Sequence, residues 1–135
     1  MEQPSAPAGA AGRRRVALWA PVALYMALIF AASSVSHPPD LSTSIGDKGA
    51  HGLLYSGLAA LMVRALAGGW QPLGAGIGLA AIAYSILYGA TDEIHQLFVP
   101  NRTADVRDLA ADAVGAAVAV VLLSMAYAVR ARVRR

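Results

Sequence analysis

The sequence contains no cysteine and little charge. Without cysteine the chain has no disulfide, no thiol nucleophile and no cysteine-ligated zinc. Charged residues make up 14% of its 135 residues and hydrophobic residues 57%, and the mean hydropathy is +0.53. A soluble domain of this length needs a more polar surface. The composition therefore favours lipid as the solvent for most of a single domain, and the net charge of +3 does not suggest a nucleic-acid partner.

Four apolar segments are separated by polar or turn-forming residues. The segments are residues 16–32, about 51–67, 73–98 and 106–129. A bilayer-spanning helix needs about 20 mostly apolar residues. The first segment follows three arginines, as a cleaved signal peptide would, but it is longer than the usual signal core of about 7–15 residues. We therefore expect a retained helix there.

The predicted fold class is all-α, a four-helix transmembrane bundle. The bundle occupies residues 16–129, between a disordered basic N-terminal tail (1–15) and a basic C-terminal tail (130–135). Two loops are expected, at residues 33–46, where Pro38 and Pro39 disfavour helix, and at the turn 68–72.

The distribution of charge predicts the orientation of the bundle. With four spans, eight of the eleven basic residues lie at one end: Arg13, Arg14, Arg15, Arg64, Arg130, Arg132, Arg134 and Arg135. The positive-inside rule then places both termini in the cytoplasm. Seven of the eight acids and all three histidines fall at the opposite, extracytoplasmic end.

Small residues predict close helix packing. Gly74 and Gly78 form one small-xxx-small pair, and Ala111, Gly115 and Ala119 form a stripe on the fourth segment. The partner helix can belong to the same chain or to a second copy, so a homo-oligomer is possible.

Polar residues recur at helical spacing near the extracytoplasmic end. Asp47, His51 and Tyr55 are four apart and share a face. The third segment places Asp92, Glu93, His95 and Gln96 near its end, and the fourth aligns Asp105, Asp108 and Asp112. Antiparallel packing would let these sets meet.

Several of these residues also have a structural interpretation. Asp47, Asp105 and Asp108 suit helix N-termini, and Lys48 and Arg107 suit lipid headgroups. Asp112 lies about two turns inside its helix, beyond any cap. An ionisable group at that depth is a functional candidate, and a structural ion pair of Asp112 or Glu93 with Arg102 is the alternative.

Three motifs together resemble the VanZ-like membrane family. They are Asp47-Lys48-x-x-His51-x-x-x-Tyr55, Tyr88-Gly89-x-x-Asp92-Glu93-x-x-Gln96-x-x-x-Pro100-x-Arg102 and Asp108-x-x-x-Asp112-x-x-Gly115. The resemblance covers about residues 25–123 and departs from the family pattern twice. Asn101 stands where that family usually has glycine, and Asn tolerates a left-handed turn. Asp112 stands where it usually has asparagine.

The resemblance implies an association with low-level tolerance of teicoplanin, a lipid-tailed glycopeptide that acts outside the membrane. The expected ligand-binding residues are Asp47, Lys48, His51, Tyr55, Asp92, Glu93, Gln96, Arg102, Asp108 and Asp112. The expected ligand is a membrane-lipid headgroup or a lipid-linked cell-wall precursor.

Two alternatives stay open: a polar latch between helices that has no ligand, and an enzyme. For the enzyme, His51 and Glu93 are the candidate catalytic acid–base pair. A divalent metal held by His51, Glu93 and Asp108 or Asp112 would reconcile the acids with a phosphate substrate. No established metal-binding spacing such as H-E-x-x-H is present.

Overall fold

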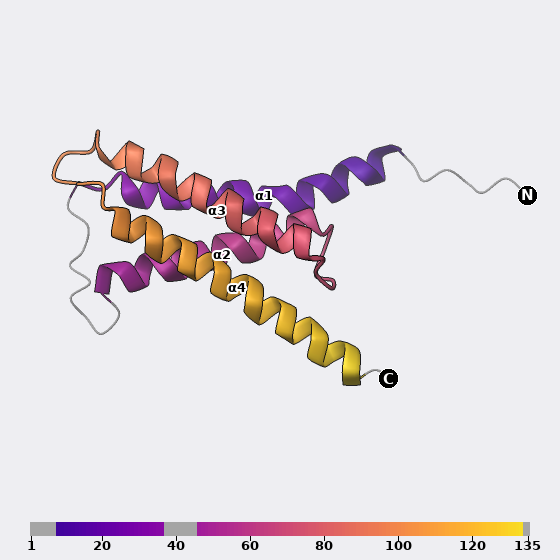
Figure 1. Cartoon of the computed structure of the whole chain (residues 1–135). Coiled ribbons are helices and arrows are strands. Elements are labelled where there is room, and N and C mark those ends of the chain that lie inside the picture. Colours follow the sequence, from indigo (N-terminus) through magenta and orange to yellow (C-terminus); the bar gives the residue numbers. More distant parts are fainter. Residues whose placement is uncertain (1–7, 37–45, 134–135) are drawn as a thin grey trace, which may run out of the picture.

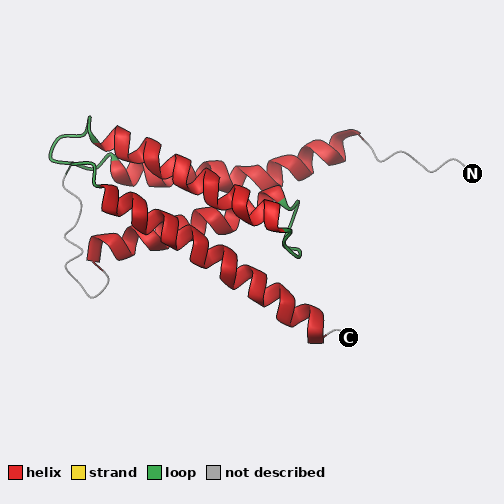
Figure 2. Cartoon of the chain, in the orientation of Figure 1, coloured by secondary structure: helices red, strands yellow, loops and turns green. Residues whose placement is uncertain are grey.

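The computed structural model describes residues 8–36 and 46–133, and over these residues it contains four helices and no strand. Helix α1 spans Ala8–Ser33, α2 spans Gly46–Leu66, α3 spans Ala75–Gln96 and α4 spans Val106–Val133 (Figure 1, Figure 2). The predicted all-helical architecture of four helices is confirmed. The start of α4 at Val106 and the turn between α2 and α3 also agree with the prediction.

The helix boundaries correct the predicted tails. Helix α1 begins at Ala8, so residues 8–15 are helical and do not belong to a disordered tail. Alanine and arginine are strong helix formers, and they extend the helix beyond its apolar segment. Helix α4 likewise continues through Arg130 and Arg132, whose charges are favourable at a helix C-terminus. The remaining predicted tail residues and most of the first loop lie outside the described residues.

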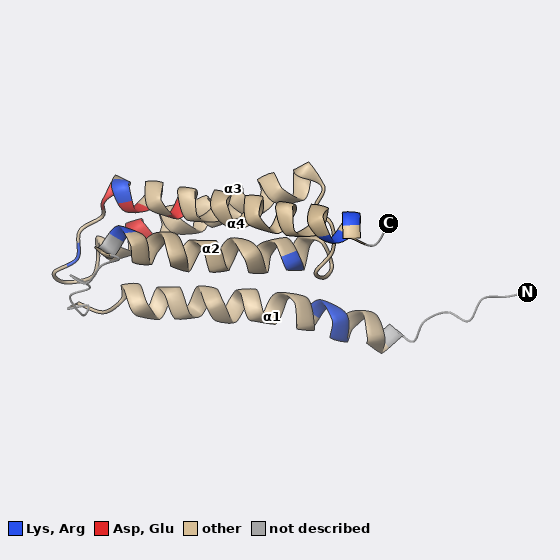
Figure 3. Ribbon diagram, turned by 90° about the horizontal axis from the view of Figure 1, so that it is seen from below, with Lys and Arg blue, Asp and Glu red and all other residues tan. Residues whose placement is uncertain are grey.

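The four helices run alternately in opposite directions. The C-terminal end of α1, the N-terminal end of α2 and the α3–α4 turn lie at one end. The N-terminal end of α1, the α2–α3 turn and the C-terminal end of α4 lie at the other (Figure 1). In Figure 3 the acidic positions gather at the first of these ends, which we call the acidic end. Arginines of α1, α2 and α4 mark the other, basic end (Figure 3).

Close contact between α2 and α4 sets how these two helices are rotated against each other. A Cβ atom on Gly115 would collide with the backbone of Gly52, so only glycine permits this approach. Gly78 of α3 meets Val120 of α4 in a similar way, because a Cβ there would lie 2.9 Å from Val120 Cγ1. The small-residue stripe therefore has its partner helices within the chain.

Several polar side chains are buried while large apolar side chains are exposed. Ser85, Gln96 and Asp112 are 0%, 3% and 1% exposed, whereas Leu79 and Leu87 of α3 are 69% and 64% exposed. The apolar core is small and lies between the helices, around Tyr55, Leu58 and Val63 of α2. Many exposed large apolar side chains together with buried polar ones suit a lipid environment.

Two helices, α1 and α4, are long and apolar enough to cross a membrane. The segments that meet this criterion are Gly9–Ser33 and Val106–Val133. Helices α2 and α3 have 21 and 22 residues. Their apolar stretches are shorter because polar residues occupy the start of α2 and the end of α3.

Candidate functional site

Three helices bring four ionisable side chains together at the acidic end. His51 comes from the second turn of α2, Glu93 from the last turn of α3, and Asp108 and Asp112 from the first two turns of α4. We call these four residues the polar cluster. Their exposed fractions are 9%, 7%, 6% and 1%, respectively. One ligating atom from each of His51, Glu93 and Asp108 lies within 4.8 Å of the other two.

His51 and Asp112 form the deepest pair of the cluster. Nδ1 of His51 lies 3.1 Å from Oδ1 of Asp112. The other oxygen, Oδ2, is buried without a hydrogen-bond partner. Gly89 makes room for it, because a Cβ at that position would lie 2.8 Å from Oδ2 and 3.4 Å from Tyr55 Cε1. Tyr55 is 1% exposed, and its hydroxyl is also buried without a partner.

Lys48 joins the start of α2 to the start of α4. Its Nζ lies 3.0 Å from Asp108 Oδ1 and 3.3 Å from Asp105 Oδ2. The predicted shared face of Asp105, Asp108 and Asp112 is therefore present and faces α2. Because the Lys48 side chain is 50% exposed, solvent weakens these ion pairs.

The turn between α3 and α4 is held by Glu93 and Asp105. The backbone N–H of Asp105 donates to Glu93 Oε2 over 2.8 Å, while Glu93 Oε1 is buried without a partner. Asn101 has a backbone φ of 62°, which is a left-handed conformation. The sequence predicted such a turn here, because the family that it resembles usually has glycine at this position. This turn brings the ends of α3 and α4 together beside His51.

Asp105 is the N-cap of α4. Its Oδ1 accepts a hydrogen bond from the backbone N–H of Arg107 over 2.8 Å, as an N-cap side chain does. This bond, with a further contribution from Lys48, holds the pKa of Asp105 below its usual range. The helix-cap interpretation is thus confirmed for Asp105, whereas Asp108 contributes to the cluster.

A second polar group lies between α1 and α3. Asp92 is 4% exposed, and its two oxygens accept hydrogen bonds from Ser33 Oγ at 2.5 Å and Gln96 Nε2 at 3.2 Å. Both Asp92 and Gln96 are therefore satisfied within the protein. His95 turns away from them, lies 3.0 Å from Ser34 Oγ and stacks on Phe30 with 4.2 Å between ring centroids.

Ser33 was missed in the sequence. Its only signal is its position at the end of an apolar helix. In an antiparallel bundle that position lies level with the end of the third helix, where Asp92 occurs.

Arg102 has no acidic partner among the described residues, so the predicted ion pair with Glu93 or Asp112 is absent there. Its Nε is buried without a hydrogen-bond partner. The side chain of Asp47, also a predicted ligand, lies outside the described residues. The predicted catalytic residues His51 and Glu93 lie close together, but His51 pairs with Asp112 and Glu93 binds the backbone of Asp105.

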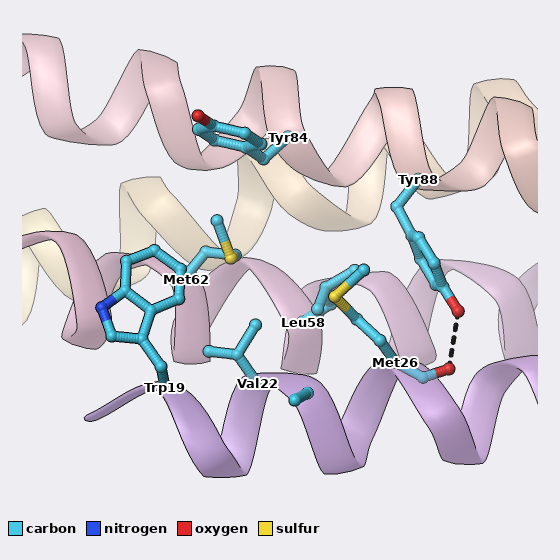
Figure 4. Close-up of a pocket in the computed structure, with 8 residues that line it drawn as sticks. Trp19, Val22, Met26, Leu58, Met62, Tyr84 and Tyr88 are labelled. Atoms are coloured by element: carbon cyan, nitrogen blue, oxygen red, sulfur yellow. Dashed lines mark hydrogen bonds between the residues drawn. The ribbon is translucent and has the colours of Figure 1, made fainter. Parts of the chain in front are cut away.

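An apolar groove of about 340 Å³ runs between α1, α2 and α3. Its lining residues include Trp19, Val22, Met26, Leu58, Met62 and Tyr88 (Figure 4). The Tyr88 hydroxyl donates to the Met26 carbonyl over 2.6 Å (Figure 4). Tyr88 stands one helical turn before Asp92, so one side of the groove lies near the polar residues of α3.

Comparison with known proteins gives one match. A family model described as VanZ/LLP1 matches residues 9–127, which is most of the chain. No curated protein and no solved structure matches the chain. The match includes all three motifs and every residue of the polar cluster, and the chain belongs to the VanZ/LLP1 family.

Proposed function

We propose that the protein crosses the bacterial cytoplasmic membrane four times and binds a phosphate-bearing headgroup at its extracytoplasmic, acidic end. The headgroup belongs to a membrane lipid or to a lipid-linked cell-wall precursor. Holding such a molecule at the outer leaflet would contribute to tolerance of teicoplanin-type glycopeptides, which act there.

Helix length and surface support four spans. A helix of about 20 residues covers the roughly 30 Å of a hydrocarbon core. The helices have 26, 21, 22 and 28 residues. Helices α2 and α3 also present large apolar side chains outwards, among them Leu53 at 61% and Leu79 at 69% exposure. The arginines at the basic end favour a cytoplasmic location for that end.

The environment of Arg102 is the main support for headgroup binding. A guanidinium is always charged and matches the geometry of phosphate oxygens. Arg102 lies in the turn between α3 and α4, has a buried Nε without a partner, and pairs with none of the described acids. A phosphate from outside the chain can supply the missing negative charge.

The apolar groove supports a lipid as the carrier of that phosphate. It lies between α1, α2 and α3, and its lining includes Tyr88, one helical turn before Asp92. A lipid chain that lay in the groove would place its headgroup near the polar residues.

Lipid retention tests this proposal. The natural protein and the Arg102→Ala variant are purified in detergent, and the co-purifying anionic and polyprenyl-phosphate lipids are quantified by mass spectrometry. Loss of charge-assisted hydrogen bonds should lower retention by about tenfold or more. Arg132→Ala, at the exposed basic end, is the matched control and should retain the natural amount. Equal retention by a folded Arg102→Ala variant would remove the proposal.

The second candidate is a latch that has no ligand. It is favoured by the way in which Lys48 ties α2 to α4 and Ser33 ties α1 to Asp92 of α3. A latch predicts that Lys48→Met lowers stability and that no variant at the acidic end changes the lipid content.

A further inference from the structure

We infer that His51, Glu93 and Asp108 bind one divalent transition-metal ion of the Mn²⁺ or Zn²⁺ class, which bridges the protein to the phosphate. The role of the ion as a bridge rests on the proposed headgroup function. Binding of the ion itself does not.

Proximity of the donors is the first observation. One donor atom from each of the three residues lies within 4.8 Å of the other two, and the residues come from three different helices. Bound ligand atoms lie about 2.0–2.3 Å from such an ion, so small side-chain adjustments bring all three donors to it. A site shared by three helices also explains why buried ionisable side chains of α2, α3 and α4 meet at this end.

Uncompensated charge is the second observation. Three carboxylates are at most 7% exposed: Glu93, Asp108 and Asp112. Among the described residues, Lys48 is the one permanent cation within ion-pair distance of any of them, and it pairs with Asp108. Lys48 is also shared with Asp105. Buried carboxylates are costly unless they are paired or coordinate a metal.

An unpartnered oxygen within the donor group supports the ion. Oε1 of Glu93 is buried without a hydrogen-bond partner, while Oε2 is used by the backbone of Asp105. Native proteins satisfy nearly all such atoms, and a metal ion held by Glu93 would satisfy this one.

The donor types select the ion. An imidazole combined with carboxylates suits Mn²⁺ or Zn²⁺ better than Mg²⁺ or Ca²⁺, which favour oxygen alone. Asp112 orients the His51 ring from its Nδ1 side. A carboxylate that orients a histidine in this way is usual beside metal-ligating histidines.

Metal titration of the full chain tests the inference. The protein is treated with chelator, reconstituted in nanodiscs of phosphatidylcholine, and titrated with Mn²⁺ by electron paramagnetic resonance. We expect one Mn²⁺ per chain, displaced by Zn²⁺, and a thermal midpoint that rises with added ion and falls again with chelator. Absence of binding, or displacement by Mg²⁺ or Ca²⁺ as effective as by Zn²⁺, would overturn the inference.

Glu93→Gln and Asp92→Asn form a matched pair of variants. Both neutralise a buried carboxylate in the last two turns of α3, but Asp92 is satisfied by Ser33 and Gln96. Glu93→Gln should weaken Mn²⁺ binding at least tenfold, and Asp92→Asn should leave it unchanged. Equal Mn²⁺ affinity of Glu93→Gln and the natural chain would contradict the site. If Glu93→Gln does not fold, His51→Gln is compared in its place.

Lipid retention separates the two proposals. If the chelator-treated protein binds Mn²⁺ while Arg102→Ala retains the natural amount of lipid, the ion site stands and headgroup binding fails. If lipid retention depends on Arg102 but no ion binds, headgroup binding stands and this inference fails.

Discussion

Oδ1 of Asp112 lies 3.1 Å from Nδ1 of His51, at 1% exposure, more than one turn inside α4. This contact gives the histidine ring a defined orientation. A ring nitrogen of His51 also lies within 4.8 Å of an oxygen of Glu93 and of an oxygen of Asp108. Asp112, where the resemblance predicts asparagine, is thus the residue that contacts the His51 ring.

Two substitutions of Asp112 should separate its effect on the orientation of His51 from its effect on the stability of the protein. The carbonyl oxygen of Asn can still accept from His51, so Asp112→Asn should keep its unfolding free energy within about 1 kcal/mol, whereas Asp112→Ala should lose about 1–3 kcal/mol. Because Asn is a weaker acceptor than a carboxylate, Mn²⁺ affinity should fall about 10- to 100-fold in Asp112→Asn. Denaturant unfolding in detergent and Mn²⁺ titration measure the two effects. Unchanged affinity in Asp112→Asn would argue against an orienting role.

Gly115 should be intolerant of any side chain. A Cβ there collides with the Gly52 backbone, so Gly115→Ala should force α2 and α4 apart and cost about 1–3 kcal/mol or more. Gly76→Ala is the control, because its Cβ would meet nothing within 4 Å. Alanine should stabilise that helical position by up to about 1 kcal/mol. Similar unfolding free energies for the two variants would show that the close helix contact is not formed.

Asn101 should be replaceable by glycine but not by alanine. Both substitutions remove the same side-chain interactions, so the difference between them isolates the backbone conformation at φ 62°. A left-handed residue with a Cβ costs about 1–2 kcal/mol relative to glycine. Asn101→Gly should therefore be more stable than Asn101→Ala by about that amount in thermal unfolding. Equal stability of the two variants would show that the turn relaxes to another conformation.

The acidic end should be reachable from outside the cell. The natural chain has no cysteine, so single-cysteine variants label without background. Thr103→Cys, in the exposed α3–α4 turn, should react with a membrane-impermeant maleimide in intact cells. Ala131→Cys, exposed near the end of α4, should react only after the membrane is opened. The reverse pattern would invert the proposed orientation and place the polar cluster in the cytoplasm.

Much of the architecture follows from patterns that are local in the chain. Apolar length and the turn residues between segments predict four helices, and spacings of three and four place Asp105, Asp108 and Asp112 on one face. The left-handed turn at Asn101 is also local. Helix ends at the basic side were harder to predict, because alanine and arginine extend a helix beyond its apolar segment, as at Ala8.

By itself, the sequence determined four helices, the gathering of acids at one end and the residues that could meet there. Only the tertiary structure decided which of them do meet: His51 with Asp112, Lys48 with Asp108, Ser33 with Asp92, and Arg102 with no described acid. The physical reason is that helical periodicity gives each helix a polar face but not its rotation or its height against a neighbour. Contacts distant in sequence set these, above all the approach of Gly115 to the Gly52 backbone.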